Sequence, residues 1–321
     1  MNPEQEDLVL IIDALNLFTR HFVAHPATGV NGEHVGGIVG FLYAIADFSE
    51  RFKPTRIVVV WEGGGSSRKR AIYSDYKQKR KPEKLNRFYE DDIPDTIENR
   101  NHQIAILVSI FKSLPINQMY IEDCEADDVI GYLSKYKIPN DKKLIVSSDK
   151  DFYQLLNKKT IIYSPTWKKF VTSKEVSSKF GVSPENFCLA KSICGDPSDN
   201  INGVKGVGFK TLAKKFPDIG MPDSLTADDI VSQCNTMIND GKKLKSIIRI
   251  SESKDLIKRN WKLIYLDTAN LSASQISKIN YNFDTFTPVR NKIHLMRLLI
   301  KEGIQTFNVD RLFLSLNHIG R

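Results

Sequence analysis

Nine carboxylates stand in the sequence at positions where they could hold metal ions together. The first set follows short apolar runs and consists of Asp13, Glu62, Asp149 and Asp151. The second set opens a predicted helix and consists of Glu125, Asp127 and Asp128, while Asp196 and Asp199 lie in a later turn. Like charges in one crevice raise each other's pKa, so nine acids could not all ionise unaided. Two divalent cations would resolve this, and at a separation of ~3.5–4 Å they could serve phosphoryl transfer.

The ligand chemistry indicates which metal would bind. Mg²⁺ and Mn²⁺ are hard ions that prefer oxygen ligands, and Cys124 is the one thiol or imidazole beside these acids, so zinc fits poorly. A helix that starts near Glu125 turns 100° per residue, so Asp128 is expected to point towards solvent and to be the weakest ligand. For each acid alone the alternative is a surface or helix-dipole role, worth ~0.3–1 kcal/mol.

The elements that must position these acids can be read from hydrophobic patterns. Three apolar runs that do not alternate with polar residues, Leu8–Ile12, Arg56–Trp61 and Lys143–Val146, predict buried parallel strands. Apolar residues every three to four positions predict helices over Val35–Phe52 and Gln103–Leu114. The alternation predicts an α/β fold with a mostly parallel central sheet and flanking helices. The acids that follow the strands would then converge at its carboxyl edge.

The second half of the chain has a different pattern. Thr160–Tyr163 is expected to add an edge strand, and from about Pro184 strands are expected to disappear in favour of helices. We therefore predict two domains, an α/β domain over residues 1–180 and a helical domain over residues 181–321.

Most of the net charge of +8 lies in one segment. Between Ser66 and Tyr89 there are nine basic and two acidic residues, which contribute +7. Four aromatic residues lie among them, as stacking on bases beside phosphate-neutralising cations requires. Nucleic acid is the expected partner, and the alternative is a solvated basic loop without one. The segment interrupts the strand–helix alternation and therefore predicts an insertion above the sheet.

A glycine-rich stretch, Gly203–Thr211, imitates two nucleotide-binding motifs and matches neither. Phe209 stands where a Walker loop needs lysine, and a dinucleotide fingerprint would need a preceding strand and a third glycine at Thr211. What remains is a hairpin that could bind phosphate through backbone N–H groups and thus hold a duplex without reading its sequence, or a plain turn. The residues concerned are Gly203, Lys205, Gly206, Gly208, Lys210, Lys214 and Lys215.

Composition excludes several classes of protein. The longest uncharged apolar run has twelve residues, Val35–Ala46, and is too short to span a membrane. The acidic start of the chain does not resemble a signal peptide, and the four cysteines show no Cys-x-x-Cys spacing. We expect reduced thiols, a cytoplasmic location and no membrane contact.

These motifs together resemble those of the structure-specific 5′-nuclease family, which includes flap endonucleases, the 5′-3′ exonuclease domain of bacterial DNA polymerase I and phage 5′-nucleases. The resemblance extends over about residues 8–216 and rests on Ile12–Asn16, Tyr76–Arg80, Glu125–Asp128, Ser148–Leu155 and Gly195–Gly208. Ser164–Val171 and the helical tail resemble most closely the stand-alone phage ribonuclease H type. The family implies a helical arch over about residues 66–100 and a helix–hairpin–helix over about residues 187–216.

The resemblance also implies roles for individual residues. Asp13, Glu62, Glu125, Asp127 and Asp149 would surround a first Mg²⁺, and Asp149, Asp151, Asp196 and Asp199 a second, with Mn²⁺ able to replace either ion. Lys77 would meet the scissile phosphate, supported by Lys69, Tyr76 and Arg80, with Arg68 and Arg70 as neighbouring nucleic-acid contacts. The hairpin would grip duplex and could hold K⁺. The implied activity is a metal-dependent 5′-3′ exonuclease and flap endonuclease that removes RNA primers and flaps during replication.

The chain departs from the family pattern at three positions. Glu62 stands where aspartate is usual, Lys69 stands where an arginine is expected, and Asn202 replaces a common proline. Glu62 keeps open the alternative of a non-catalytic junction-binding protein. The glycine hairpin argues against a second alternative, a small PIN-type nuclease directed at RNA. We expect a monomer that binds DNA and RNA–DNA hybrids, with a sliding clamp and a single-strand-binding protein as further partners.

Overall fold

The computed structural model describes residues 7–78, 97–242 and 244–320, and its centre is a six-stranded sheet. The strand order is β3-β2-β1-β4-β5-β6, with β1 to β5 parallel and β6 antiparallel at the edge. The strands are β1 Leu8–Asp13, β2 Arg56–Trp61, β3 Asn117–Tyr120, β4 Lys142–Val146, β5 Thr160–Ser164 and β6 Lys169–Val171. The predicted α/β fold with a mostly parallel sheet is confirmed.

Two strands of the sheet were not predicted. β3 reads Asn-Gln-Met-Tyr and lacks an apolar run, and two of the three β6 residues are exposed. Both lie next to a strand with a strong apolar pattern, and pairing with that neighbour outweighs their weak local preference.

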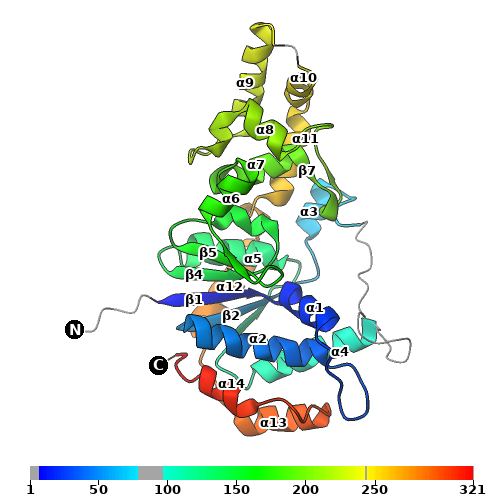
Figure 1. Cartoon of the computed structure of the whole chain (residues 1–321), viewed down its shortest axis with the longest axis vertical. Coiled ribbons are helices and arrows are strands. Elements are labelled where there is room, and N and C mark those ends of the chain that lie inside the picture. The colour runs from blue at the N-terminus through cyan, green and yellow to red at the C-terminus, as the bar shows by residue number, and fades with distance from the viewer. Residues whose placement is uncertain (1–6, 79–96, 243, 321) are drawn as a thin grey trace, which may run out of the picture.

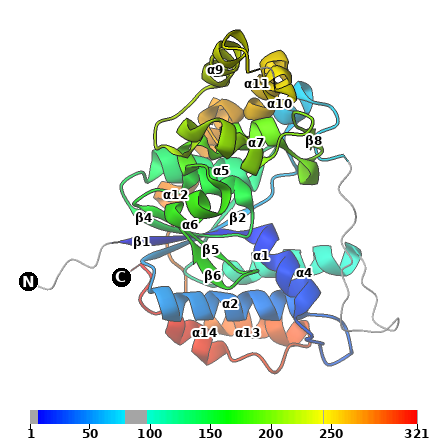
Figure 2. The same cartoon turned by 45° about the horizontal axis from the view of Figure 1, so that its top comes forward.

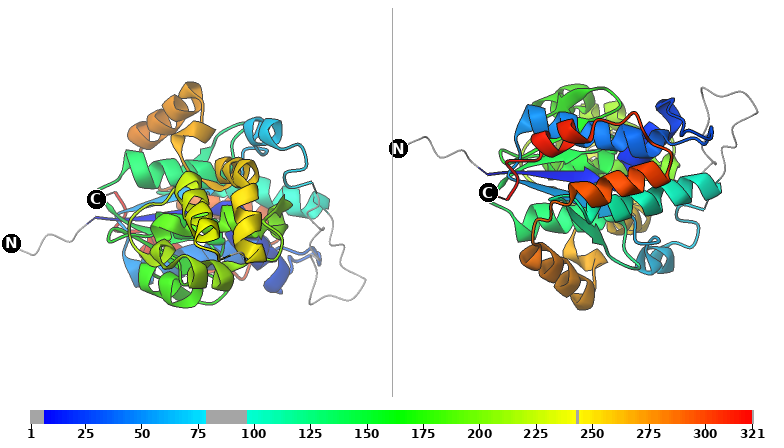
Figure 3. Two further views of the ribbon diagram at one scale, coloured as in Figure 1. Left: turned by 90° about the horizontal axis from the view of Figure 1, so that it is seen from above. Right: turned by 90° about the horizontal axis from the view of Figure 1, so that it is seen from below.

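Alternate residues of the strands point to opposite faces and produce two cores. Leu10 and Ile12 of β1 face one core, while Val9 and Ile11 face the other. The helices that cover the Leu10 face are α1 Ala14–Ala24, α2 Gly36–Phe52, α4 Ile97–Phe111, α13 Lys292–Lys301 and α14 Val309–Ser315. Figure 1, Figure 2 and Figure 3 show the two C-terminal ones below the sheet, α14 against α2 and α13 against α4.

The opposite face carries α5 and, above it in Figure 1, the helical upper part of the molecule. These helices are α5 Ala126–Tyr132, α6 Ser173–Phe180, α7 Pro184–Cys194, α8 Phe209–Lys215, α9 Ala227–Asn239, α10 Lys245–Glu252, α11 Lys254–Ile264 and α12 Ala273–Thr285. A short antiparallel pair, β7 Gly195–Asp196 and β8 Ile201–Asn202, lies where no further strands were expected.

The basic segment begins with α3, Ser67–Ile72, which packs against α11. The predicted arch continues into residues 79–96, which lie outside the described part of the chain. Among the described helices, none has the length and the apolar character needed to cross a membrane.

Candidate active site

The carboxylates that end the strands meet at one edge of the sheet. β1 pairs in parallel with both β2 and β4, so Asp13 lies between the strands that lead to Glu62 and Asp149. Asp13 accepts hydrogen bonds from the Asn16 N–H at 3.2 Å and from the Ser147 hydroxyl at 3.0 Å. Burial raises the pKa of Asp13 to about 7, and the nearby charges of Asp149 and Glu62 act in the same direction.

We call Glu125, Asp127 and Asp128 the first acidic group; oxygens of all three lie within 4.8 Å of one another. Glu125 occupies the N-cap position of α5 but makes no capping bond with its side chain. Its carboxylate instead accepts hydrogen bonds from the Lys69 ammonium at 2.7 Å, the Tyr76 hydroxyl at 2.9 Å and the Lys77 ammonium. Burial alone would raise the pKa of Glu125, but the two lysines outweigh it and lower the pKa to about 2.

The prediction that Asp128 points towards solvent is wrong. Its side chain is fully buried, lies 2.8 Å from the Lys69 ammonium and accepts a hydrogen bond from the Asn270 amide at 2.9 Å. The prediction considered only the helical periodicity of α5 itself. Lys69 and Asn270, which lie 59 and 142 residues from Asp128 in the sequence, cover the face of α5 that carries Asp128. Asp128 therefore ranks with the buried members of the group, and Asn270 is a site residue that the sequence did not reveal.

The first acidic group fits a divalent cation. Asp127 has a buried carboxylate oxygen, Oδ1, that accepts no hydrogen bond from any described residue and lies 3.7 Å from the Lys69 ammonium. A buried carboxylate oxygen without a hydrogen bond is costly unless a cation approaches it. Burial raises the pKa of Asp127 well above its usual range, so the ionised form needs more positive charge than Lys69 supplies.

We call Asp151, Asp196 and Asp199 the second acidic group, whose oxygens also lie within 4.8 Å of one another. Lys191 of α7 extends into this group, where its ammonium lies 2.6 Å from Asp196 and also pairs with Asp151. Burial raises the pKa of Asp151 to about 7 in spite of Lys191. Lys191 was not predicted as a site residue. The feature that could have revealed it is a lone lysine in an otherwise apolar stretch of helix.

Lys77 connects the two acidic groups. Its ammonium binds Glu125 of the first group and lies 4.0 Å from Asp199 of the second. Its backbone N–H donates to the Asp199 carbonyl at 3.0 Å, and its φ of +59° is unusual for a residue other than glycine. Lys69, Tyr76 and Lys77 thus contact the first acidic group, and Lys77 also reaches the second. Charge interactions link the strand-end acids to these groups, Glu62 to Glu125 and Asp149 to Asp151.

The other predicted basic residues lie in different settings. The Arg68 guanidinium donates to the carbonyls of Ala269 at 3.0 Å and Leu271 at 3.3 Å, so it is engaged with the segment that carries Asn270. Arg70 is exposed beside Gly65. Arg80 lies outside the described residues.

The glycine stretch follows β8 and runs into α8, and its first residue, Gly203, packs against Gly195, which precedes Asp196 of the second acidic group. A Cβ on Gly203 would lie 2.2 Å from the Cys194 carbonyl, and Gly206 has a φ of +79°, so both positions require glycine. Gly208 is the N-cap residue of α8. Lys205, Lys210 and Lys214 are exposed and Lys215 is half-buried, which leaves a basic surface around the hairpin.

Residues 8–181 match the family model described as the 5′-3′ exonuclease, N-terminal resolvase-like domain, which is more than half of the chain. The chain belongs to the 5′-3′ exonuclease family. It is similar to the 5′-3′ exonuclease of Aquifex aeolicus, with 31% identity over 214 residues, covering 65% of this chain and 70% of that protein. It is also similar to DNA polymerase I of Bacillus subtilis, with 30% identity over 78% of this chain and 27% of the polymerase.

A solved structure supports the fold. The T5 D15 protein, crystallised with metal ions, superposes with a TM-score of 0.67 at 22% identity, covering 91% of this chain and 99% of that one. The family match confirms the predicted resemblance and the assignment of the chain to a family of nucleases. The individual residue roles stay predictions.

Proposed function

We propose that this member of the 5′-3′ exonuclease family is a two-metal phosphodiesterase that hydrolyses DNA from 5′ ends and at junctions of single and double strand. The observation that carries the proposal is the pair of buried acidic groups that Lys77 bridges. Such a site would stabilise negative charge and hold metal ions.

Mg²⁺ is the proposed metal, with Mn²⁺ as a substitute. Two divalent ions, when bound, lower the pKa of water and stabilise the leaving oxygen. The first ion would be held by Asp13, Glu62, Glu125, Asp127 and Asp149, and the second by Asp149, Asp151, Asp196 and Asp199. A solved structure of the T5 5′-exonuclease has divalent metal ions, in that case zinc, bound to it, which supports a metal-dependent reaction here without selecting Mg²⁺.

The remaining residues of the site have separate tasks in this proposal. Lys77 lies between the two acidic groups, where its ammonium would exchange carboxylate contacts for the scissile phosphate and stabilise the developing charge. Tyr76 and Lys69 orient Glu125 through its Oε2 atom. Asp128 is engaged with Lys69 and Asn270, so we assign it a positioning role behind the metal ligands.

The basic surfaces indicate how nucleic acid would be held. The segment that begins at α3 would form the base of an arch that admits single strand, and the hairpin between α7 and α8 would grip duplex as a helix–hairpin–helix, with K⁺ in the hairpin. One structure of the T5 enzyme is titled a flap endonuclease complex with DNA and metal ions. Similarity to DNA polymerase I supports a task in replication, such as removal of flaps and of RNA in RNA–DNA hybrids. The two-domain division, contacts with a sliding clamp or a single-strand-binding protein, and the monomeric state stay predictions.

The proposal is tested with a 5′-labelled flap duplex, the wild-type protein and Asp149→Asn, each with Mg²⁺ and with chelator. Short products from the junction are expected only for wild type with Mg²⁺, because Asp149 would contact both ions. Undiminished cleavage by Asp149→Asn contradicts the metal assignment. Binding without cleavage by wild type favours the non-catalytic alternative. Glu62→Asp is then the next variant, because the Glu62 carboxylate accepts a hydrogen bond from the Ala126 N–H at 3.2 Å and lies beside the first acidic group.

A further inference from the structure

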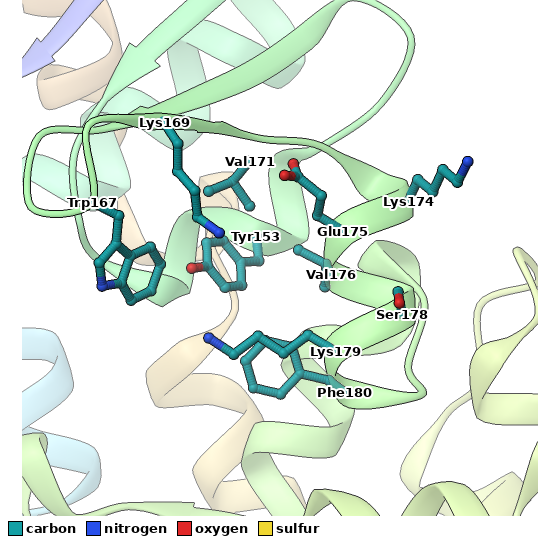
Figure 4. A pocket seen from close by; sticks show the side chains of 10 residues that line it. All are labelled: Tyr153, Trp167, Lys169, Val171, Lys174, Glu175, Val176, Ser178, Lys179 and Phe180. Atoms are coloured by element: carbon teal, nitrogen blue, oxygen red, sulfur yellow. The ribbon is translucent and has the colours of Figure 1, made fainter.

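A separate cavity of about 320 Å³ lies between the β5–β6 hairpin and α6 (Figure 4). Its volume is at the lower end of the range of ~300–1,000 Å³ that is usual for sites of small organic groups. Trp167 and Tyr153 form two walls, and Phe180 lies below them. The Trp167 side chain is 41% exposed, so part of its ring is accessible to a ligand.

Two lysine side chains point into this cavity. Figure 4 shows the ammonium groups of Lys169 and Lys179 directed into the space between Trp167 and Tyr153, while Lys174 points away. The Lys179 ammonium lies 4.7 Å from the centre of the Trp167 ring, and the Lys169 ammonium lies 5.7 Å from it. The one acid of the lining, Glu175, has its carboxylate engaged as the capping box of α6. The cavity is therefore aromatic and positively charged.

The cavity is connected to the active site through Ser148. The Ser148 hydroxyl bonds with the Thr166 hydroxyl at 2.8 Å and accepts from the Thr166 N–H at 3.2 Å. Ser148 precedes Asp149, and Thr166 precedes Trp167, so one pair of hydrogen bonds joins the two sites. Burial raises the pKa of Tyr153, in the wall, to about 12, and the charge of Asp149 acts in the same direction.

We propose that this cavity, the Trp167 cavity, is a second nucleic-acid subsite that holds one unpaired nucleotide of the substrate. The base would stack on the Trp167 indole, and its phosphates would lie against the ammonium groups of Lys169 and Lys179. The proposal rests on the proposed function, since it assumes a nucleic-acid substrate. It adds a contact outside the carboxylate centre, the arch and the glycine hairpin.

The chemistry selects an unpaired nucleotide over a base pair. A base within a duplex has both faces covered by its neighbours, whereas an unpaired base offers a free face to an aromatic side chain. Lys179 occupies the face of Trp167 in the free protein through a cation–π contact, and an incoming phosphate would draw that ammonium aside.

The test uses tryptophan fluorescence in the presence of chelator, so that no cleavage occurs. The protein has three tryptophans, and Trp61 is buried, so Trp261→Phe leaves Trp167 as the exposed reporter. A flap duplex with an unpaired tail is expected to quench Trp167, and a blunt duplex of the same length is not. Trp167→Ala is expected to weaken flap binding between about fivefold and 150-fold, with Trp167→Phe retaining most of the affinity.

Lysine variants provide the charge test with a matched control. The double variant Lys169→Ala/Lys179→Ala is expected to reduce the slope of log affinity against log salt by about 1.4 for the flap. Lys174 lies on α6, as Lys179 does, but its side chain points away from the cavity. Lys174→Ala is therefore expected to leave the salt dependence of flap binding unchanged.

Several outcomes overturn the proposal. Equal quenching by blunt duplex, no quenching by the flap, or equal effects of Lys174→Ala and the double variant each do so. Adenosine monophosphate that quenches as strongly and at the same concentration as the flap would identify a free nucleotide as the occupant instead. If wild type cleaves the flap in Mg²⁺ but Trp167 is not quenched, the nucleotide site in the Trp167 cavity is contradicted and the proposed function is not. If Trp167 is quenched but no cleavage occurs in Mg²⁺, the proposed function is contradicted and the nucleotide site is not.

Discussion

The two acidic groups are neutralised from different parts of the molecule. The first group comes from four consecutive positions at the start of α5, and its lysines, Lys69 and Lys77, come from the segment that follows β2. The second group is assembled from a short 3-10 helix, Lys150–Leu155, and the turn after α7, and its lysine comes from the interior of α7 itself. Lys77 contacts both groups.

This difference indicates which lysines are held in place and which lysine can exchange a carboxylate contact for a phosphate contact. Lys191 extends from a helix whose sides are nearly all buried, so its backbone is held in place. Lys69 is 1% exposed and is surrounded by three carboxylates, whereas the Lys77 side chain is 20% exposed and has a strained backbone. Lys77 is therefore the cation most able to exchange a carboxylate for a substrate phosphate.

The largest loss of stability is expected for Lys69→Met. A harmless Lys69→Met would contradict the view that Lys69 is a fixed part of the site. The substitution leaves buried Asp128 without its closest cation and Glu125 with only Lys77, and should lower the free energy of unfolding by about 3–5 kcal/mol. Urea unfolding without metal measures this loss. Lys174→Met, at an exposed position, is the matched control and should stay within about 0.5 kcal/mol of wild type.

Lys77→Met should separate catalysis from stability. Because Lys77 is partly exposed and bridges the groups, we expect cleavage under single-turnover conditions to slow by about 10²–10³-fold, with a much smaller loss of stability than Lys69→Met causes. Single-turnover rates in saturating Mg²⁺, beside urea unfolding of the same variant, distinguish the two. A rate within threefold of wild type would remove Lys77 from the proposed charge stabilisation.

Asn270 tests how far the first acidic group depends on the C-terminal segment. Asn270→Ala leaves a buried oxygen of Asp128 without its donor, so a loss of about 1–3 kcal/mol is expected. Asn270→Asp should be worse, because it adds a like charge beside Asp128. The control is Asn239→Ala, an exposed residue at the end of α9. Equal stability of Asn270→Ala and Asn239→Ala would show that the contact contributes nothing.

The smallest effect concerns pH and the strand-end carboxylate Asp13. Its pKa of about 7 in the folded protein exceeds the ordinary 3.8, so the folded state binds a proton more tightly than the unfolded state. Its contribution to the free energy of unfolding is therefore lost as pH rises, by about 1.4 kcal/mol between pH 6 and 8. Asp13→Asn keeps the helix cap and removes the titration, so metal-free stability of this variant relative to wild type should rise over that interval. A constant difference between the two proteins would contradict the assignment.

The features predicted correctly share one property, which is that a local pattern specifies them. Continuous apolar runs predicted β1, β2 and β4, and the acids that follow them meet because parallel strands end at one edge. Glu125 was expected to open a helix, and it does so. β3 could not be predicted in this way, since its polar residues become a strand through pairing with β2.

The errors and omissions in the site arise from contacts between distant segments. The solvent-facing prediction for Asp128 failed because Lys69 and Asn270 cover that side of α5. Lys191 was missed because its partners Asp151 and Asp196 come from separate turns.

Residue order alone determined the α/β class, the carboxylates at the strand ends, the basic segment and the family, because each depends on a run or a spacing within a few residues. Tertiary structure decided which cation neutralises which acid, that Asp128 is buried, and that Lys77 lies between the two acidic groups. The physical reason is that charge interactions depend on distance and burial, and both are set when segments more than 40 residues apart pack together.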